Sequence, residues 1–102
     1  RMSAGKIASQ CAHAAVGSVR SMRAGGVLAA WDANAQAKIV TQVPNERQLR
    51  QLQRQCQSAG LHTFTVADAG RTEVSSGALT VLACGPAPAQ ALQPITGRLR
   101  LL

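Results

Sequence analysis

The chain has 102 residues, of which 46% are hydrophobic, so it is long enough to form one domain with a buried core. Eleven Lys and Arg residues against four Asp and Glu residues give a formal net charge of +7 at pH 7. This charge favours a polyanionic partner, and a basic protein with no such partner is the alternative. No apolar run approaches the roughly 20 residues needed to cross a bilayer, and no secretory signal opens the chain.

The first half of the chain predicts two helices and a strand. Ser3 is a suitable N-cap for an Ala-rich helix over residues 4–23, where the apolar period is 3.6 residues. A glycine pair then ends this helix, and a short helix is expected over residues 27–34. The β-rich run over residues 38–43, ended by Pro44, predicts a strand.

The second half of the chain predicts two more helices and two more strands. Asn45 is expected to cap a helix over residues 46–59. Residues 61–67 alternate as a half-exposed strand, and the apolar run 78–84 predicts a strand buried on both faces. A last helix is expected over residues 88–97, interrupted near a proline. Strands that alternate with helices indicate an α/β sandwich, with helices on both faces of a small central sheet of three strands.

The three cysteines are widely spaced and form no C-x-x-C pair. We therefore expect Cys11, Cys56 and Cys84 to be small buried residues in a reducing compartment, with neither a disulfide framework nor a zinc site. Metal ligation is not expected, because the two histidines have no cysteine pair to support them.

Three polar side chains share one line of the first predicted helix. Lys6, Gln10 and His13 are spaced by four and three residues, so they lie on one face near the helix start. A cation, an amide and an imidazole held together on a rigid helix indicate a polar site. For Lys6 the alternative is a solvated charge, and for His13 it is a histidine that only holds the sheet.

A second polar cluster follows the strand over residues 61–67. It comprises Asp68, Arg71 and Thr72 around Gly70, and Thr80 lies in the next strand. Residues at strand ends often carry the sites of α/β proteins, and glycine permits a tight turn there. Asp68 could instead cap the turn, and Thr80 could be an ordinary β-branched strand residue.

In this order, the two clusters resemble the peptidyl-tRNA hydrolase type 2 family over essentially the whole chain. The matching positions are Gly5-Lys6, Gln10, Cys11, His13-Ala14-Ala15, Asp68-Ala69-Gly70-Arg71-Thr72, Gly77, Thr80-Val81 and Gly85-Pro86.

The resemblance implies a three-layer α/β sandwich around a small mixed sheet of four strands. Its first strand would precede the helix that carries Lys6, and only three strands are visible here. Because Arg1 cannot be a translation start, we expect residues 1–102 to be one N-terminally truncated domain. The family hydrolyses the ester bond between a peptide and tRNA, without a cofactor. The resemblance further implies a homodimer, protein partners in eukaryotes, and a cytoplasmic location with mitochondria as the alternative.

The resemblance also implies roles for the two clusters. Lys6, His13, Asp68 and Thr72 are the expected catalytic residues, with Asp68 the general base, because a carboxylate near Lys6 stays ionised. Water would attack directly, since no Ser-His-Asp arrangement is visible and Cys11 falls on an apolar line. The expected substrate-binding residues are Gln10, Thr80, Arg71, Arg47, Arg50 and Arg54.

Arg47, Arg50 and Arg54 form a basic stripe on the helix over residues 46–59. They are expected to contact the tRNA backbone, with a solvated helix face as the alternative. Binding would depend strongly on salt, and base stacking is not expected in a chain with only two aromatic residues. A non-catalytic module that binds RNA or protein on the same scaffold is the competing hypothesis.

Overall fold

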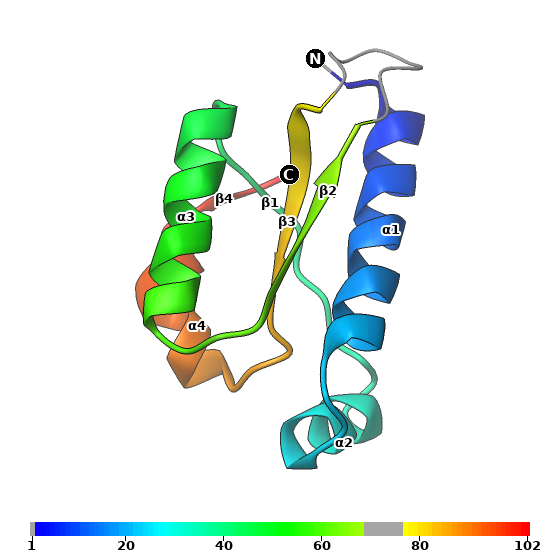
Figure 1. Ribbon diagram of the computed structural model, residues 1–102, viewed down its shortest axis with the longest axis vertical. Helices are drawn as coiled ribbons and strands as arrows, with labels where there is room; N and C mark the ends of the chain where they lie inside the picture. Colours follow the sequence, from blue (N-terminus) through cyan, green and yellow to red (C-terminus); the bar gives the residue numbers. More distant parts are fainter. Residues whose placement is uncertain (1, 69–76) are drawn as a thin grey trace.

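The computed structural model describes residues 2–68 and 77–102. The elements follow one another as α1 (Ala4–Ser21), α2 (Gly26–Ala33), β1 (Thr41–Gln42), α3 (Glu46–Ser58), β2 (Thr63–Ala67), β3 (Leu79–Cys84), α4 (Ala89–Thr96) and β4 (Arg100–Leu101). Helix α1 covers one face of the β2–β3 hairpin, and α3 covers the other (Figure 1). This layering confirms the predicted α/β class.

Both predicted helix caps are confirmed. Ser3 accepts a hydrogen bond from the backbone N–H of Lys6 (3.3 Å), and Asn45 accepts one from Gln48 (2.9 Å). These bonds satisfy amide groups that have no partner inside the helix. The predicted helices differ from the observed ones by at most two residues at either end.

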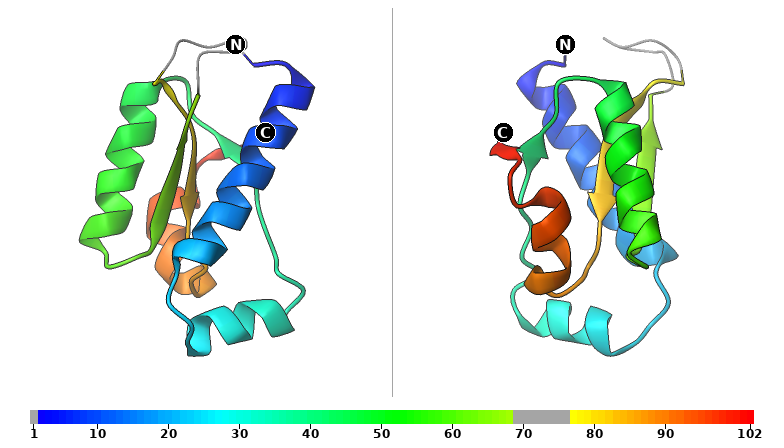
Figure 2. Two further views of the ribbon diagram at one scale, coloured as in Figure 1. Left: turned by 45° about the vertical axis from the view of Figure 1, so that its right-hand side comes forward. Right: turned by 90° about the vertical axis from the view of Figure 1, so that its left-hand side faces the viewer.

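The strands differ from the prediction in pairing. β2 pairs with β3 and β1 with β4, both antiparallel, in two separate sheets (Figure 2). The parallel pairing that a mixed sheet requires is absent from the described ranges. The expected strand 38–43 is reduced to Thr41–Gln42, because its unforeseen partner β4 offers only two residues. The further N-terminal strand stays a prediction.

β3 is less buried than its apolar sequence predicts. All six of its residues are half-buried, although α1 and α3 lie on its two faces. Beyond β2, the edge of β3 pairs with no other strand of residues 2–68 and 77–102. This edge of β3, unpaired within the described ranges, therefore leaves its residues in partial contact with solvent, although a helix covers each face of the strand. Ile39, two residues before β1, and Leu101 of β4 are exposed by 79% and 69%.

β2 runs alongside α1 in the opposite direction, and its alternation determines which residues meet the helix. His62 reaches the C-terminal end of α1, where its Nε2 lies 2.9 Å from the hydroxyl of Ser21. Phe64 lies against the middle of α1 and Asp68 against its first turn. Residues of one strand face thus contact successive turns of the helix.

The close approach of α1 to β2 depends on Gly17. A Cβ atom at this position would lie 2.2 Å from Cε2 of Phe64. Only the hydrogen atom of a glycine fits at position 17, so the aromatic ring of Phe64 packs directly on the helix backbone.

We expect Gly17→Ala to lower the free energy of unfolding by about 1–2 kcal/mol. Overpacking costs about 1–3 kcal/mol, and the better helix propensity of alanine returns up to about 1 kcal/mol. Gly5→Ala in the same helix is the matched control, because no atom lies within 4 Å of its added Cβ. Urea unfolding checks this, and equal stability of the two variants would contradict the packing argument.

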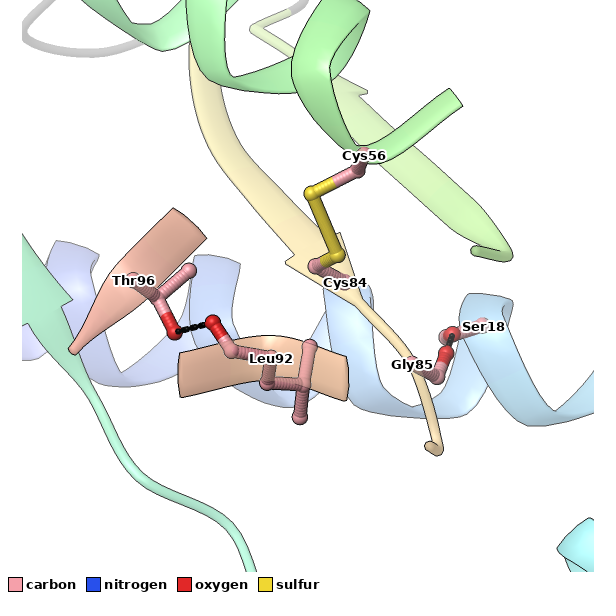
Figure 3. The surroundings of a disulfide bond; sticks show 6 residues. All are labelled: Ser18, Cys56, Cys84, Gly85, Leu92 and Thr96. Carbon is pink, nitrogen blue, oxygen red and sulfur yellow. Dashed lines mark hydrogen bonds between the residues drawn. A yellow bond between two sulfur atoms is a disulfide. The ribbon is translucent and has the colours of Figure 1, made fainter. Parts of the chain in front are cut away.

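The prediction of three reduced cysteines is wrong for two of them. Cys56 of α3 and Cys84 at the end of β3 form a disulfide across 28 residues, with their Cα atoms 6.7 Å apart (Figure 3). Their spacing in the sequence did not predict this, because the pairing arises from the packing of α3 on β3. Next to Cys84, the carbonyl of Gly85 accepts a 2.8 Å hydrogen bond from buried Ser18. The chain is therefore fastened to both helical layers at this point. Cys11 is the free cysteine.

Candidate active site

Lys6 and Asp68 form an ion pair between the first turn of α1 and the end of β2. The Lys6 ammonium donates to Oδ1 of Asp68 at 2.5 Å. Both side chains are largely buried, with exposures of 13% for Lys6 and 2% for Asp68. Charges withdrawn from water in this way interact more strongly than surface pairs. The structure thus brings together one residue from each of the two polar clusters predicted from the sequence.

The backbone of Asp68 is held by the start of β3. Its N–H donates to the carbonyl of Ala78, and its carbonyl accepts from the N–H of Gly77, both at 2.9 Å. Gly77 has a φ of +83°, a conformation that glycine adopts without strain. These two hydrogen bonds extend the pairing of β2 with β3 as far as Asp68 and so position the backbone that carries the carboxylate.

A second contact between α1 and the sheet joins Gln10 to Thr80. The Thr80 hydroxyl donates to Oε1 of Gln10, and it also lies 3.2 Å from the carbonyl of Val66. Gln10 is one helical turn beyond Lys6, so the two contacts stand next to each other along α1. With its oxygen oriented by Thr80, the Gln10 amide has N–H groups left to donate to a ligand.

Thr80 is placed by an irregularity of the sheet. Val66 pairs with Val81 but Ala67 pairs with Leu79, so Thr80 is an extra residue on β3. Such bulges bend a strand and redirect a side chain, and they are frequent next to active sites. The sequence carries no signal for this bulge.

His13 does not join the other two residues of its line in a polar contact. It is exposed, and its ring lies 6.3 Å from that of Phe64, tilted by 46°. Among the residues that the structure describes, no hydrogen bond or ion pair of the His13 ring is found. Its catalytic role stays a prediction. Arg71 and Thr72 lie outside the described residues.

Cys11 lies on α1 between these groups and is half-buried. Burial raises the pKa of its thiol, which disfavours the nucleophilic thiolate. In the described ranges, no group of three His, Cys, Asp or Glu side chains could hold a metal ion. No described helix is long and apolar enough to span a membrane.

The arginine stripe of α3 is exposed, and its N-terminal end lies at the same end of the molecule as the start of α1 (Figure 1). Arg50 is paired with Glu46 at 2.7 Å. For Arg47 and Arg54, no carboxylate of residues 2–68 and 77–102 lies within ion-pair distance. Two guanidinium groups are thus available to an external anion.

An ammonium, a carboxylate and an oriented amide can together act on a polar carbonyl compound. The carboxylate can accept a proton from water, and the ammonium can stabilise an oxyanion. The sequence predicted each of these residues. It did not predict the buried Ser18, whose hydroxyl fastens α1 to Gly85.

Comparison with known proteins gives a consistent result. The model of the family described as peptidyl-tRNA hydrolase PTH2 matches residues 1–102. The mouse protein named peptidyl-tRNA hydrolase 2, mitochondrial, is 39% identical over 99% of this chain and 57% of its own length. A fission yeast protein named probable peptidyl-tRNA hydrolase 2 is 42% identical over 98% of the chain and 50% of its own length.

An archaeal relative is closer to this chain in length than the mouse and fission yeast proteins are. The peptidyl-tRNA hydrolase of Thermococcus onnurineus is 36% identical over 100% of this chain and 88% of its own length. The chain spans about half the length of the mouse and fission yeast relatives. A family match over all 102 residues, together with these identities, shows that the chain belongs to the peptidyl-tRNA hydrolase PTH2 family.

Proposed function

We propose that this protein hydrolyses the ester bond of peptidyl-tRNA and releases free tRNA and peptide. The observation that carries the proposal is the buried Lys6–Asp68 pair beside the Gln10–Thr80 contact, on a chain of this family. The relatives' names supply the substrate, and the net charge of +7 suits a polyanion such as tRNA.

In the proposed reaction, a water molecule attacks the carbonyl carbon of the ester. Asp68 accepts a proton from this water, and Lys6 stabilises the negative charge that develops on the carbonyl oxygen. The new carbon–oxygen bond replaces the bond to the ribose, and the proton then passes to the leaving ribose oxygen. Gln10 positions the substrate through its amide N–H groups, while Thr80 holds the amide in place.

Arg47 and Arg54 are proposed to bind tRNA phosphates. Each lost phosphate contact should lower the slope of log affinity against log salt by roughly one. Arg50 already faces Glu46, so it should contribute less. Arg71, Thr72 and His13 are proposed to complete the site, on the resemblance alone.

We expect the purified protein to release labelled N-acetyl-aminoacyl residues from tRNA much faster than buffer does. The ethyl ester of the same N-acetylated amino acid is the control, and its hydrolysis should be slow because it lacks the polyanion. A folded protein that binds the tRNA and leaves the ester intact would contradict the proposed function.

We also propose that the protein acts as a homodimer in the cytoplasm, with mitochondria as the alternative because the mouse, bovine and human relatives are named mitochondrial. Sedimentation at several protein concentrations tests the dimer.

A further inference from the structure

A groove runs along the side of α3 that faces α4. Its volume is about 560 Å³, and it is lined by Gln51, Arg54, Gln55, Ser58, Ala59 and Ile95. A smaller hollow of about 200 Å³ continues it toward Val43 and Leu99 and shares Gln51 and Gln55. We call the larger hollow the α3 groove.

The α3 groove has one wall of hydrogen-bonding groups. Gln51 and Gln55 are one helical turn apart, and Ser58 follows three residues later, so the three side chains stand in a row. Both glutamines are exposed. In the described parts of the chain, no hydrogen bond of either amide is found, and each therefore offers donors and an acceptor to a ligand.

The charge beside this row is positive. Arg54 lines the groove, and Arg47 lies two turns earlier on the exposed face of α3. Neither is paired with a carboxylate of residues 2–68 and 77–102, in contrast to Arg50. A row of neutral amides flanked by unpaired guanidinium groups complements an anionic backbone that also carries hydroxyl groups.

The same surface lacks aromatic side chains on which unpaired bases could stack. Neither aromatic residue lines the groove: Phe64 lies against α1, and the indole N–H of Trp31 donates to the carbonyl of Ala37. Stacking is therefore not available. Double-stranded RNA is recognised in another way, through phosphates and 2′-hydroxyl groups across its wide, shallow minor groove.

We propose that this face of α3 binds the double-stranded part of an RNA by its A-form backbone. Gln51 and Gln55 hydrogen-bond to 2′-hydroxyl groups, while Arg47 and Arg54 contact phosphates. The inference rests on the proposed function and specifies how its substrate is recognised. α3 begins at the same end of the molecule as the first turn of α1 but lies on the opposite face of the hairpin (Figures 1 and 2), so a bound RNA helix would follow α3 and extend past its Arg47 end toward the ester site.

The test compares an RNA hairpin with a stem of about 12 base pairs and the DNA hairpin of the same sequence, by fluorescence anisotropy. The protein should bind the RNA roughly ten-fold more tightly, as the loss of one or two hydrogen bonds implies. The double variant Gln51→Ala, Gln55→Ala should bring the two affinities together and keep the salt slope. Arg54→Gln should instead weaken both complexes and lower the slope by roughly one.

Gln57→Ala is the matched control, since Gln57 is an exposed glutamine of α3 that does not line the groove. It should preserve both affinities. Equal binding of RNA and DNA by the wild-type protein, or a preference that survives loss of Gln51 and Gln55, would overturn the inference. Hydrolysis of peptidyl-tRNA by the wild-type protein is measured separately. A protein that hydrolyses peptidyl-tRNA but fails the binding test contradicts the proposed RNA binding by the α3 groove and leaves the proposed function intact.

Discussion

Asp68→Asn is expected to lower the rate of peptidyl-tRNA hydrolysis by roughly 10²- to 10⁴-fold, the usual contribution of a general base. The amide keeps the shape of the carboxylate and cannot take up the proton of the attacking water. The effect should fall on kcat, because the proposed tRNA contacts are the arginines of α3 and not this side chain. Single-turnover kinetics at saturating protein measures it directly.

Loss of activity must be separated from loss of folding. Asp68→Asn leaves the Lys6 ammonium buried without its counter-charge, and breaking a buried pair costs about 3–5 kcal/mol. The double variant Lys6→Met, Asp68→Asn removes both charges and should recover part of the stability while remaining inactive.

Asp32→Asn is the control, because Asp32 is exposed and accepts a hydrogen bond from Gln36 outside the candidate site. Its activity should be unchanged. A folded Asp68→Asn protein with a wild-type rate would show that Asp68 is not the base.

Reduction of the disulfide should have the largest effect on stability. For two cysteines 28 residues apart, loop-closure entropy predicts about 3.5 kcal/mol. In a chain of this size that corresponds to a fall in Tm of roughly 15–25 °C. Cys56 is fully buried, so the reductant should be added during unfolding and refolding. Scanning calorimetry with and without reductant measures the change.

Two variants test whether the loss of stability on reduction comes from the Cys56–Cys84 disulfide. Cys11→Ala should remain as sensitive to reductant as the wild-type protein, because Cys11 is the free cysteine. Cys56→Ala, Cys84→Ala should be insensitive. If thiol titration of the unfolded, unreduced protein finds three thiols, the disulfide is absent and the prediction fails.

The candidate site was predictable to the extent that it depends on local spacing. The line of Lys6 and Gln10 follows from helical periodicity, and the alternation over residues 61–67 predicted a strand. Residues two apart in a strand share a face, so Asp68 continues the face of Phe64 and Val66. Their functional roles came from the resemblance to a family and are still to be tested.

Other features depend on contacts between segments that are distant in the sequence. The bulge that places Thr80 depends on the register between β2 and β3. β4 forms only because β1 lies beside it, and the exposed position of His13 depends on where α1 crosses Phe64.

The sequence by itself therefore determined the helices with their caps, the strand alternation and the polar line of α1, since these arise from residues a few positions apart. Only the tertiary structure decided that Cys56 meets Cys84 and that Lys6 is paired and buried. The reason is physical. A cap or a period is a property of one turn, whereas the distance between two side chains 28 or 62 residues apart is determined by how α1 and α3 pack on the hairpin.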